Sequence, residues 1–278
     1  MKKTLYVSDL DGTLLNTKDE LSEYTKQILN ILIKQGINFT YATARSFSSA
    51  SKVTKGLNIN LPVIVYNGTM AFDPVTRNML YQIDFDKEER MELVETISRY
   101  DISPIVYSYI KGVERVSWVT KYENYGQRRY IQNRQGDKRM NPLYSPKQLY
   151  DGNIFYFTCI GEREELMELY EALLLLPYCT ITFHQELYRT EYWLEIMPKK
   201  ATKASGILRL KEELGYERII SFGDAINDLP MFGISDECYA VYNAVTSLKE
   251  KATAVILSNE EDGVARWIKE HAHINYGL

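Results

Sequence analysis

Hydrophobic and polar positions in the first 70 residues alternate between strand-like runs and a helix-like face. The run Thr4–Ser8 is typical of a β-strand and ends at Asp9. Apolar residues then recur at helical spacing at Leu21, Tyr24, Ile28, Ile31 and Leu32. The pattern continues as a strand, a helix and a strand over residues 37–43, 46–55 and 62–66. This alternation predicts a parallel sheet covered by helices.

The last 80 residues return to the same alternation. Residues 203–214 carry one apolar helical face, and Gly215 ends the helix. The pattern then predicts strands over 218–222, 237–242 and 254–257 and a final helix over 263–270.

The middle of the chain has a different pattern, in which a helix followed by two strands occurs twice. The predicted helices cover 87–100 and a stripe centred on Leu169, and the predicted strands cover 103–109, 112–119, 153–159, 179–184 and 191–197. We therefore expect an α/β core from residues 1–84 and 195–278, with an α+β domain inserted at 85–194.

Composition narrows the class of protein. Apolar residues make up 45% of the 278 positions, and the net charge is 33 − 37 = −4. This composition excludes a disordered chain. The chain has no net positive charge that would favour binding to nucleic acid. There is no apolar run near the ~20 residues of a membrane span, and the apolar run at the N-terminus breaks too early for a signal peptide. Three cysteines without C-x-x-C spacing are typical of reduced thiols, so we expect a cytoplasmic protein.

Polar residues follow four of the predicted core strands. They are Asp9 with Asp11, then Thr43-Ala44-Arg45, then Asn67-Gly68, and finally Gly223-Asp224 with Asn227 and Asp228. Ligands of open parallel sheets bind beyond the carboxyl ends of the strands, so these side chains are expected in one pocket. Two carboxylates ~4 Å apart repel by ~4 kcal/mol at an effective dielectric near 20. An all-oxygen set without His or Cys favours a hard cation, above all Mg²⁺.

The spacing of Asp9 and Asp11 suits phosphoryl transfer, because residues two apart in an extended segment face the same side. One carboxylate can attack phosphorus while the other manages the proton. The phosphoryl oxygens need neutralising donors, for which Thr43 and Lys203 at a predicted helix start are the candidates.

These motifs resemble those of the haloacid dehalogenase-like superfamily. Asp9-Leu10-Asp11-Gly12-Thr13 resembles the family's motif one. Thr43 resembles motif two and Lys203 motif three, and the segment from Gly223-Asp224 to Asn227-Asp228 resembles motif four. The predicted insert resembles the α/β cap of type IIB, or Cof-like, phosphatases. The resemblance extends to Asn243-Ala244 and to residues 258–265, so it covers nearly the whole chain.

The resemblance implies a role for each matching residue. Asp9 would be the nucleophile and Asp11 the general acid/base, while Thr43, Ala44 and Lys203 would hold the phosphoryl group. Mg²⁺ would be bound by Asp9, by the Asp11 backbone carbonyl and by Asp224, with Asn227 or Asp228 nearby. Arg45 and Asn67 are candidate substrate contacts. Two departures from the family pattern are Ala44 and Ala204, at positions where Gly is common. Lys199 and Lys200, just before Lys203, are rival candidates for motif three.

The function that this implies is a Mg²⁺-dependent phosphatase for small phosphorylated metabolites, with sugar phosphates as the expected class. It would work through an aspartyl-phosphate intermediate. A phosphomutase-like phosphotransferase with the same two aspartates and a non-catalytic binding protein are the alternatives. No nucleic-acid, membrane or obligate protein partner is expected.

One charged segment leaves two interpretations open. Residues 121–139 contain six basic and two acidic side chains, net +4 in a chain of net −4. They could attract an anionic substrate or simply form a solvated helical face.

Overall fold

The structure is a computed structural model that describes residues 3–185 and 190–272. The chain divides into two compact units, one made of Met1–Gln82 with Ala201–Leu278 and one of Ile83–Lys200. Each helix among the described residues is too short or too polar to span a lipid bilayer.

Five parallel strands form the central sheet of the first unit, in the order β14–β13–β12–β1–β2. Their bounds are β1 Thr4–Ser8, β2 Asn38–Tyr41, β12 Arg218–Gly223, β13 Glu237–Val241 and β14 Ala254–Ile256. Every residue of β1 after Thr4 is buried, which is typical of a strand with both faces covered. The predicted α/β class with a parallel sheet is confirmed.

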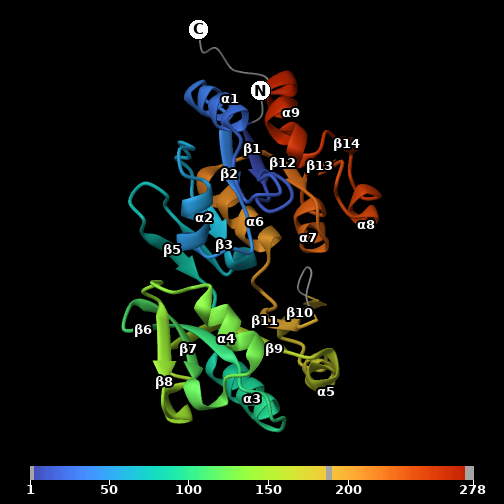
Figure 1. The fold of residues 1–278 in the computed structure, drawn as a ribbon. Coiled ribbons are helices and arrows are strands. Elements are labelled where there is room, and N and C mark those ends of the chain that lie inside the picture. Colours follow the sequence, from blue (N-terminus) through green and yellow to red (C-terminus); the bar gives the residue numbers. More distant parts are fainter. Residues whose placement is uncertain (1–2, 186–189, 273–278) are drawn as a thin grey trace. The chain divides into compact units, whose positions relative to one another are not determined.

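Six helices accompany this sheet: α1 Glu23–Lys34, α2 Phe47–Val53, α6 Lys203–Leu214, α7 Leu229–Phe232, α8 Thr246–Lys249 and α9 Gly263–His271. Helix α1 packs beside α9, and α6 packs against α7 (Figure 1). The first turn of α6 is fixed by a capping box of Thr202 and Ser205, and Gly215 ends the helix at φ 66°. Lys203 is therefore held at a well-defined helix start.

The third predicted strand differs from expectation in its pairing. It is β3, Val63–Val65, and it joins the antiparallel strands β4, Met70–Phe72, and β5, Met79–Gln82. A single parallel bridge, Ala42 to Ile64, connects it to the chain after β2. The turn that follows β3 brings β4 directly back alongside it, so local antiparallel pairing is favoured.

The second unit is built on a six-stranded sheet in the order β10–β11–β9–β6–β7–β8. Its strands are β6 Ile105–Ile110, β7 Val113–Val119, β8 Met140–Leu143, β9 Asn153–Gly161, β10 Cys179–Gln185 and β11 Tyr192–Pro198. Its helices are α3 Lys87–Ser98, α4 Tyr125–Gln132 and α5 Arg163–Leu173. Among the described residues of this unit, β7 pairs with β8 in parallel and the other pairs of the sheet are antiparallel.

The repeated helix–strand–strand pattern of the sequence corresponds to α3–β6–β7 and α5–β10–β11. Helices α3 and α5 contribute Leu93, Ile97, Leu166 and Leu169 to an apolar core with strand residues such as Phe157. The sequence pattern did not predict α4 and β8, because neither carries a long apolar period.

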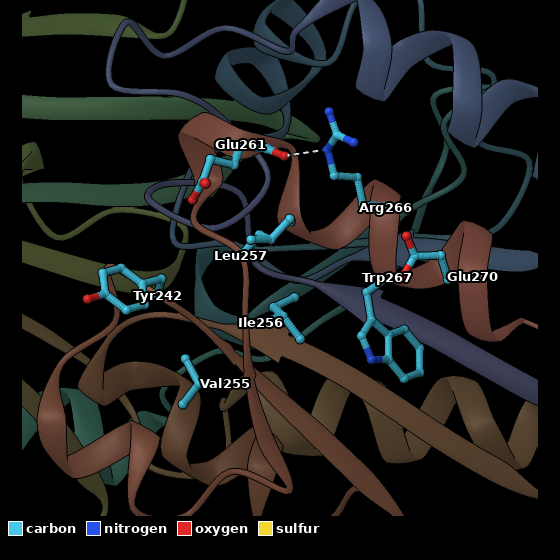
Figure 2. Close-up of a pocket in the computed structure, with 9 residues that line it drawn as sticks. Tyr242, Val255, Ile256, Leu257, Glu261, Arg266, Trp267 and Glu270 are labelled. Carbon is cyan, nitrogen blue, oxygen red and sulfur yellow. Dashed lines mark hydrogen bonds between the residues drawn. The ribbon is translucent and has the colours of Figure 1, made fainter.

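A surface cavity of about 720 Å³ lies in the first unit, where β14 and α9 contribute most of its lining (Figure 2). Val255 and Trp267 are among its lining residues, and Arg266 donates from Nε to the Glu261 carbonyl oxygen over 2.8 Å. No residue predicted for the site lines this cavity.

Candidate active site

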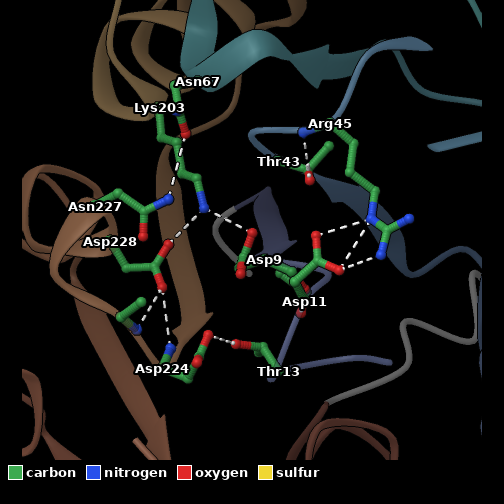
Figure 3. Close-up of polar contacts among 12 residues, drawn as sticks. Asp9, Asp11, Thr13, Thr43, Arg45, Asn67, Lys203, Asp224, Asn227 and Asp228 are labelled. Carbon is green, nitrogen blue, oxygen red and sulfur yellow. Dashed lines mark hydrogen bonds and ion pairs between the residues drawn. The ribbon is translucent and has the colours of Figure 1, made fainter. Parts of the chain in front are cut away.

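Two neighbouring strands bring the first and fourth motifs together. Strands β1 and β12 pair in parallel, and the Asp9 N–H donates to the Phe222 carbonyl oxygen over 2.9 Å. Asp9 follows β1 and Asp224 follows β12, so their side chains leave the sheet at the same edge (Figure 3). This is the carboxyl edge at which open parallel sheets bind ligands.

Lys203 lies between two aspartates from different parts of the chain. Its Nζ donates to Asp9 Oδ1 over 2.6 Å and to Asp228 Oδ1 over 2.7 Å. The lysine is 1% exposed, so this ammonium group is removed from water and depends on the two carboxylates (Figure 3). The rivals Lys199 and Lys200 are exposed, and Lys200 pairs with Glu89 in the second unit.

Asp228 is fully buried and has partners for both of its oxygens. Oδ1 accepts from Lys203, and Oδ2 accepts the backbone N–H groups of Asp224 and Ala225 over 3.0 and 3.1 Å. A Cβ at Gly223 would lie 2.7 Å from Oδ2, so the close approach requires glycine there. Asp228 thus fixes both the motif-four loop and the lysine.

Asp224 is held by Thr13, a motif-one residue for which the sequence predicts no role. The Thr13 hydroxyl donates to Asp224 Oδ1 over 2.8 Å. Gly12 has φ 72°, and a Cβ on it would clash with the Asp224 carboxylate. The Asp-Gly-Thr sequence after the first strand was the available signal for this contact.

The buried charges of this cluster do not balance. Three carboxylates, those of Asp9, Asp224 and Asp228, face one ammonium group, which leaves a formal charge of −2. Burial raises the pKa of Asp9 well above its ordinary value, and Lys203 opposes this only in part. Burial also raises the pKa of Asp224 to about 6. Burial alone would lower the pKa of Lys203, but Asp228 and Asp9 outweigh it and raise that pKa.

The donor set is suited to a divalent cation. One carboxylate oxygen from each of the three aspartates lies within 4.8 Å of the others. Hard oxygen donors and an excess charge of −2 match a hard divalent ion. Asp11 was expected to bind the ion through its backbone carbonyl, and its carboxylate contacts Arg45. Asn227 Nδ2 donates to Asn67 Oδ1 over 3.3 Å.

Motif two lies beside this cluster. Thr43 is fully buried, and its Oγ1 accepts the backbone N–H of Arg45 over 3.1 Å. Ala44 is exposed. The backbone of Asn67 donates to the Thr43 carbonyl oxygen over 2.9 Å, which joins the second and third strand ends.

The turn after β3 is conformationally constrained. Tyr66, Asn67 and Gly68 have φ values of 49°, 53° and 99°, and a Cβ at Gly68 would clash with the Thr202 carbonyl group. The first two are unusual for residues with side chains. This turn therefore holds Asn67 close to Asn227 and brings Gly68 against the start of α6.

Two further asparagines support the segment that follows Asp11. Asn243 Nδ2 donates to the Gly12 carbonyl oxygen over 2.7 Å, and Asn259 Nδ2 donates to that of Leu15 over 2.9 Å. The two are linked, because the Asn259 N–H donates to Asn243 Oδ1 over 3.1 Å. In the sequence, both asparagines were noted only as part of the family resemblance.

Comparisons with known proteins identify chains that are similar to this one over nearly their whole length. A 5-amino-6-(5-phospho-D-ribitylamino)uracil phosphatase of Bacillus subtilis, YitU, is 26% identical over 273 residues, which cover 97% of this chain and 98% of that protein. A haloacid dehalogenase-like hydrolase from Bacteroides thetaiotaomicron is 26% identical at a TM-score of 0.75, covering 97% of this chain and 99% of that one.

A third protein shares the fold at lower identity. The HAD subclass IIB sugar phosphatase BT4131 has a TM-score of 0.75 at 20% identity, covering 96% of this chain and 98% of that one. The model of the haloacid dehalogenase-like hydrolases matches residues 6–268. This match spans both units and all four motifs, and the chain is therefore an enzyme of the haloacid dehalogenase-like hydrolase family.

Proposed function

We propose that this enzyme is a Mg²⁺-dependent phosphatase of small phosphorylated metabolites that acts through an aspartyl-phosphate on Asp9. The observation that carries the proposal is the Asp9–Lys203–Asp228 arrangement, in which a buried carboxylate lies at the sheet edge beside a cation. A buried nucleophile next to fixed positive charge is what phosphoryl transfer requires.

The first step forms a bond between an Asp9 carboxylate oxygen and phosphorus. The bond from phosphorus to the ester oxygen breaks, and Asp11 gives its proton to that leaving oxygen. Lys203 and the Thr43 hydroxyl stabilise the charge that develops on the phosphoryl oxygens. The product alcohol then leaves.

The second step consumes water. Asp11, now ionised, removes a proton from a water molecule whose oxygen bonds to phosphorus, and the bond to Asp9 breaks. Inorganic phosphate leaves, and both aspartates return to their starting protonation states.

Asp9, Asp224 and the Asp11 backbone carbonyl would hold Mg²⁺, with Asn227 nearby. The bound ion would neutralise the excess negative charge, which keeps the Asp9 carboxylate ionised and screens the phosphoryl group. Asp228 has partners for both oxygens, so its role in this proposal is to position Lys203 and the loop.

Sugar or polyol phosphates are the proposed substrate class. The name of YitU specifies a phosphorylated ribityl compound, and BT4131 is named a sugar phosphatase. We also propose that the inserted domain, expected at residues 85–194, acts as the cap that selects among such esters.

The proposal is tested by phosphate release from a panel of sugar phosphates, nucleotides, cofactor phosphates and p-nitrophenyl phosphate. Each is assayed with Mg²⁺ and with a chelator. We expect release from sugar phosphates that the chelator abolishes and added Mg²⁺ restores. Transfer to an added sugar acceptor without net phosphate release would instead establish a phosphotransferase.

A further inference from the structure

Each nitrogen of the Arg45 guanidinium group contacts a protein atom. Its Nε donates to both oxygens of Asp11 over 2.9 Å, and Nη2 also contacts Asp11 (Figure 3). Nη2 lies 3.1 Å from Asp19 Oδ1, and Nη1 lies 3.3 Å from Ser49 Oγ. All three nitrogens thus have protein partners, and this geometry favours a role through Asp11 beside the expected substrate contact.

Both ends of Arg45 are anchored. Its backbone N–H donates to Thr43 Oγ1, and its carbonyl oxygen accepts from the Tyr66 N–H over 3.0 Å. Its side chain is 19% exposed, whereas that of Asp11 is 45% exposed. A rigid donor fork therefore holds a carboxylate that solvent would otherwise leave free to rotate.

Asp19 reaches Arg45 from a short loop with its own support. Asn16 Oδ1 accepts the N–H groups of Lys18 and Glu20 over 2.9 and 3.0 Å, and Asp19 adopts φ 61°. This left-handed conformation is uncommon for a residue with a side chain and is maintained by the loop around it. The loop thus places a second carboxylate on the arginine.

We propose that Arg45 is a positioning residue that orients the Asp11 carboxylate for proton transfer, and that Asp19 holds Arg45 in place. This inference rests on the proposed phosphatase function. An oriented carboxylate avoids the loss of rotational freedom that proton transfer would otherwise cost at the transition state. In this role Arg45 acts through Asp11.

The test uses two phosphate esters whose leaving groups differ in their need for a proton. p-Nitrophenolate leaves without protonation, whereas an alkoxide such as that of a sugar phosphate needs the proton of Asp11. The value of kcat/KM reports the steps up to release of the alcohol. Loss of the Asp11 orientation should therefore lower kcat/KM mainly for the alkyl ester. General acid catalysis contributes about 10²–10⁴-fold, so we expect Arg45→Met to lower kcat/KM for the alkyl ester by about 100-fold and for the aryl ester by less than about 5-fold.

A double variant separates positioning from substrate contact. In an Asp11→Asn background, Arg45→Met should lower kcat/KM for the alkyl ester by less than about 3-fold, because its target is gone. Arg209→Met is the matched control: it removes an arginine whose Nε also bonds a carboxylate, Glu213 at 2.9 Å, on the surface of α6. The control should match the wild type on both esters.

Two results would overturn the inference. One is an equal loss on both esters, and the other is a 100-fold loss that persists in the Asp11→Asn background. If Arg45→Met does not fold, Asp19→Asn serves instead, because its carboxylate is 66% exposed; it should show the same preference for the alkyl ester at about 3–10-fold. A wild-type enzyme that hydrolyses neither ester would contradict the proposed function itself, and the positioning role would fall with it.

Discussion

Two charged regions of this chain differ in how their charges are neutralised. In the first unit, Asp9, Asp224 and Asp228 lie around the ammonium of Lys203 with a formal charge of −2, and all but Asp224 are buried. In the second unit, residues 121–139 carry net +4 in the sequence. In the sequence, the second region stands out more, because its net charge is opposite in sign to that of the whole chain.

Acidic side chains of the second unit pair with several basic residues of segment 121–139. Arg129 lies 2.6 Å from Glu191, and Arg139 lies 2.8 Å from Glu114 and 2.6 Å from Asp137. Arg134 stacks on the Tyr130 ring at 3.5 Å. The comparison teaches that an excess of charge of one sign within a cluster, and not net charge along a segment, marks a candidate ligand site.

Substitution of the proposed nucleophile, Asp9, should have the largest effect on activity. Asp9→Asn removes the attacking oxygen while keeping the shape of the side chain, so kcat should fall by about 10⁴-fold or more and no phosphoenzyme should form. Phosphate release measures kcat, and acid quenching of the enzyme with phosphate-labelled substrate measures the phosphoenzyme. Glu213→Gln, a surface carboxylate of α6, is the control. An Asp9→Asn enzyme with near-normal turnover would remove Asp9 as nucleophile.

The excess charge of the cluster predicts metal-linked stability. Mg²⁺ at about 100 times its Kd should add about 2.7 kcal/mol to the free energy of unfolding, a rise in Tm of about 5–10 °C. Asp224→Asn should remove most of this rise, as measured by thermal unfolding with Mg²⁺ and with a chelator. A rise that is unchanged in Asp224→Asn would place the ion elsewhere.

The raised pKa of Asp224 predicts how stability depends on pH without metal. Because that pKa is about 6 in the folded protein and 3.8 in the unfolded chain, the folded state binds more protons between these values. Stability therefore falls as pH rises through this window. After discounting for partial exposure, Asp224→Asn should be about 1–2 kcal/mol more stable than the wild type at pH 7 and equal to it near pH 3.5. The opposite slope, measured by urea unfolding with chelator present, would contradict the unbalanced cluster.

The smallest effects are expected in the basic region. The side chains of Arg129 and Glu191 are only 17% and 7% exposed. Arg129→Gln should therefore lower the free energy of unfolding by about 1–2 kcal/mol, because it removes a cation that pairs with a buried carboxylate. Arg128 is 64% exposed and 3.8 Å from Glu123, so Arg128→Gln should change stability by less than about 0.5 kcal/mol. Neither should change kcat/KM by more than about 2-fold. A large rise in KM for Arg128→Gln would restore the substrate-attracting interpretation.

Much of the fold could be predicted from the sequence because its signals are local. The apolar periods of α1 and α6, the glycine at the end of α6 and the polar residues after β1 and β12 are all visible within short windows. The chain-order rules for parallel sheets then bring Asp9 and Asp224 to one edge. Short elements such as β4, β5, β8 and α4 were missed because they span too few residues to show a period.

The sequence by itself determined the fold class, the family resemblance and which carboxylates gather at the sheet edge. Only the tertiary structure decided which cation each carboxylate takes: Lys203 for Asp9 and Arg45 for Asp11. It also decided that Asp228 has partners for both oxygens and that Thr13 holds Asp224. Lys203 and Asp9 are 194 residues apart, and Thr13 and Asp224 are 211 apart. Pairings over such separations follow from side-chain orientation and burial, which no local pattern encodes.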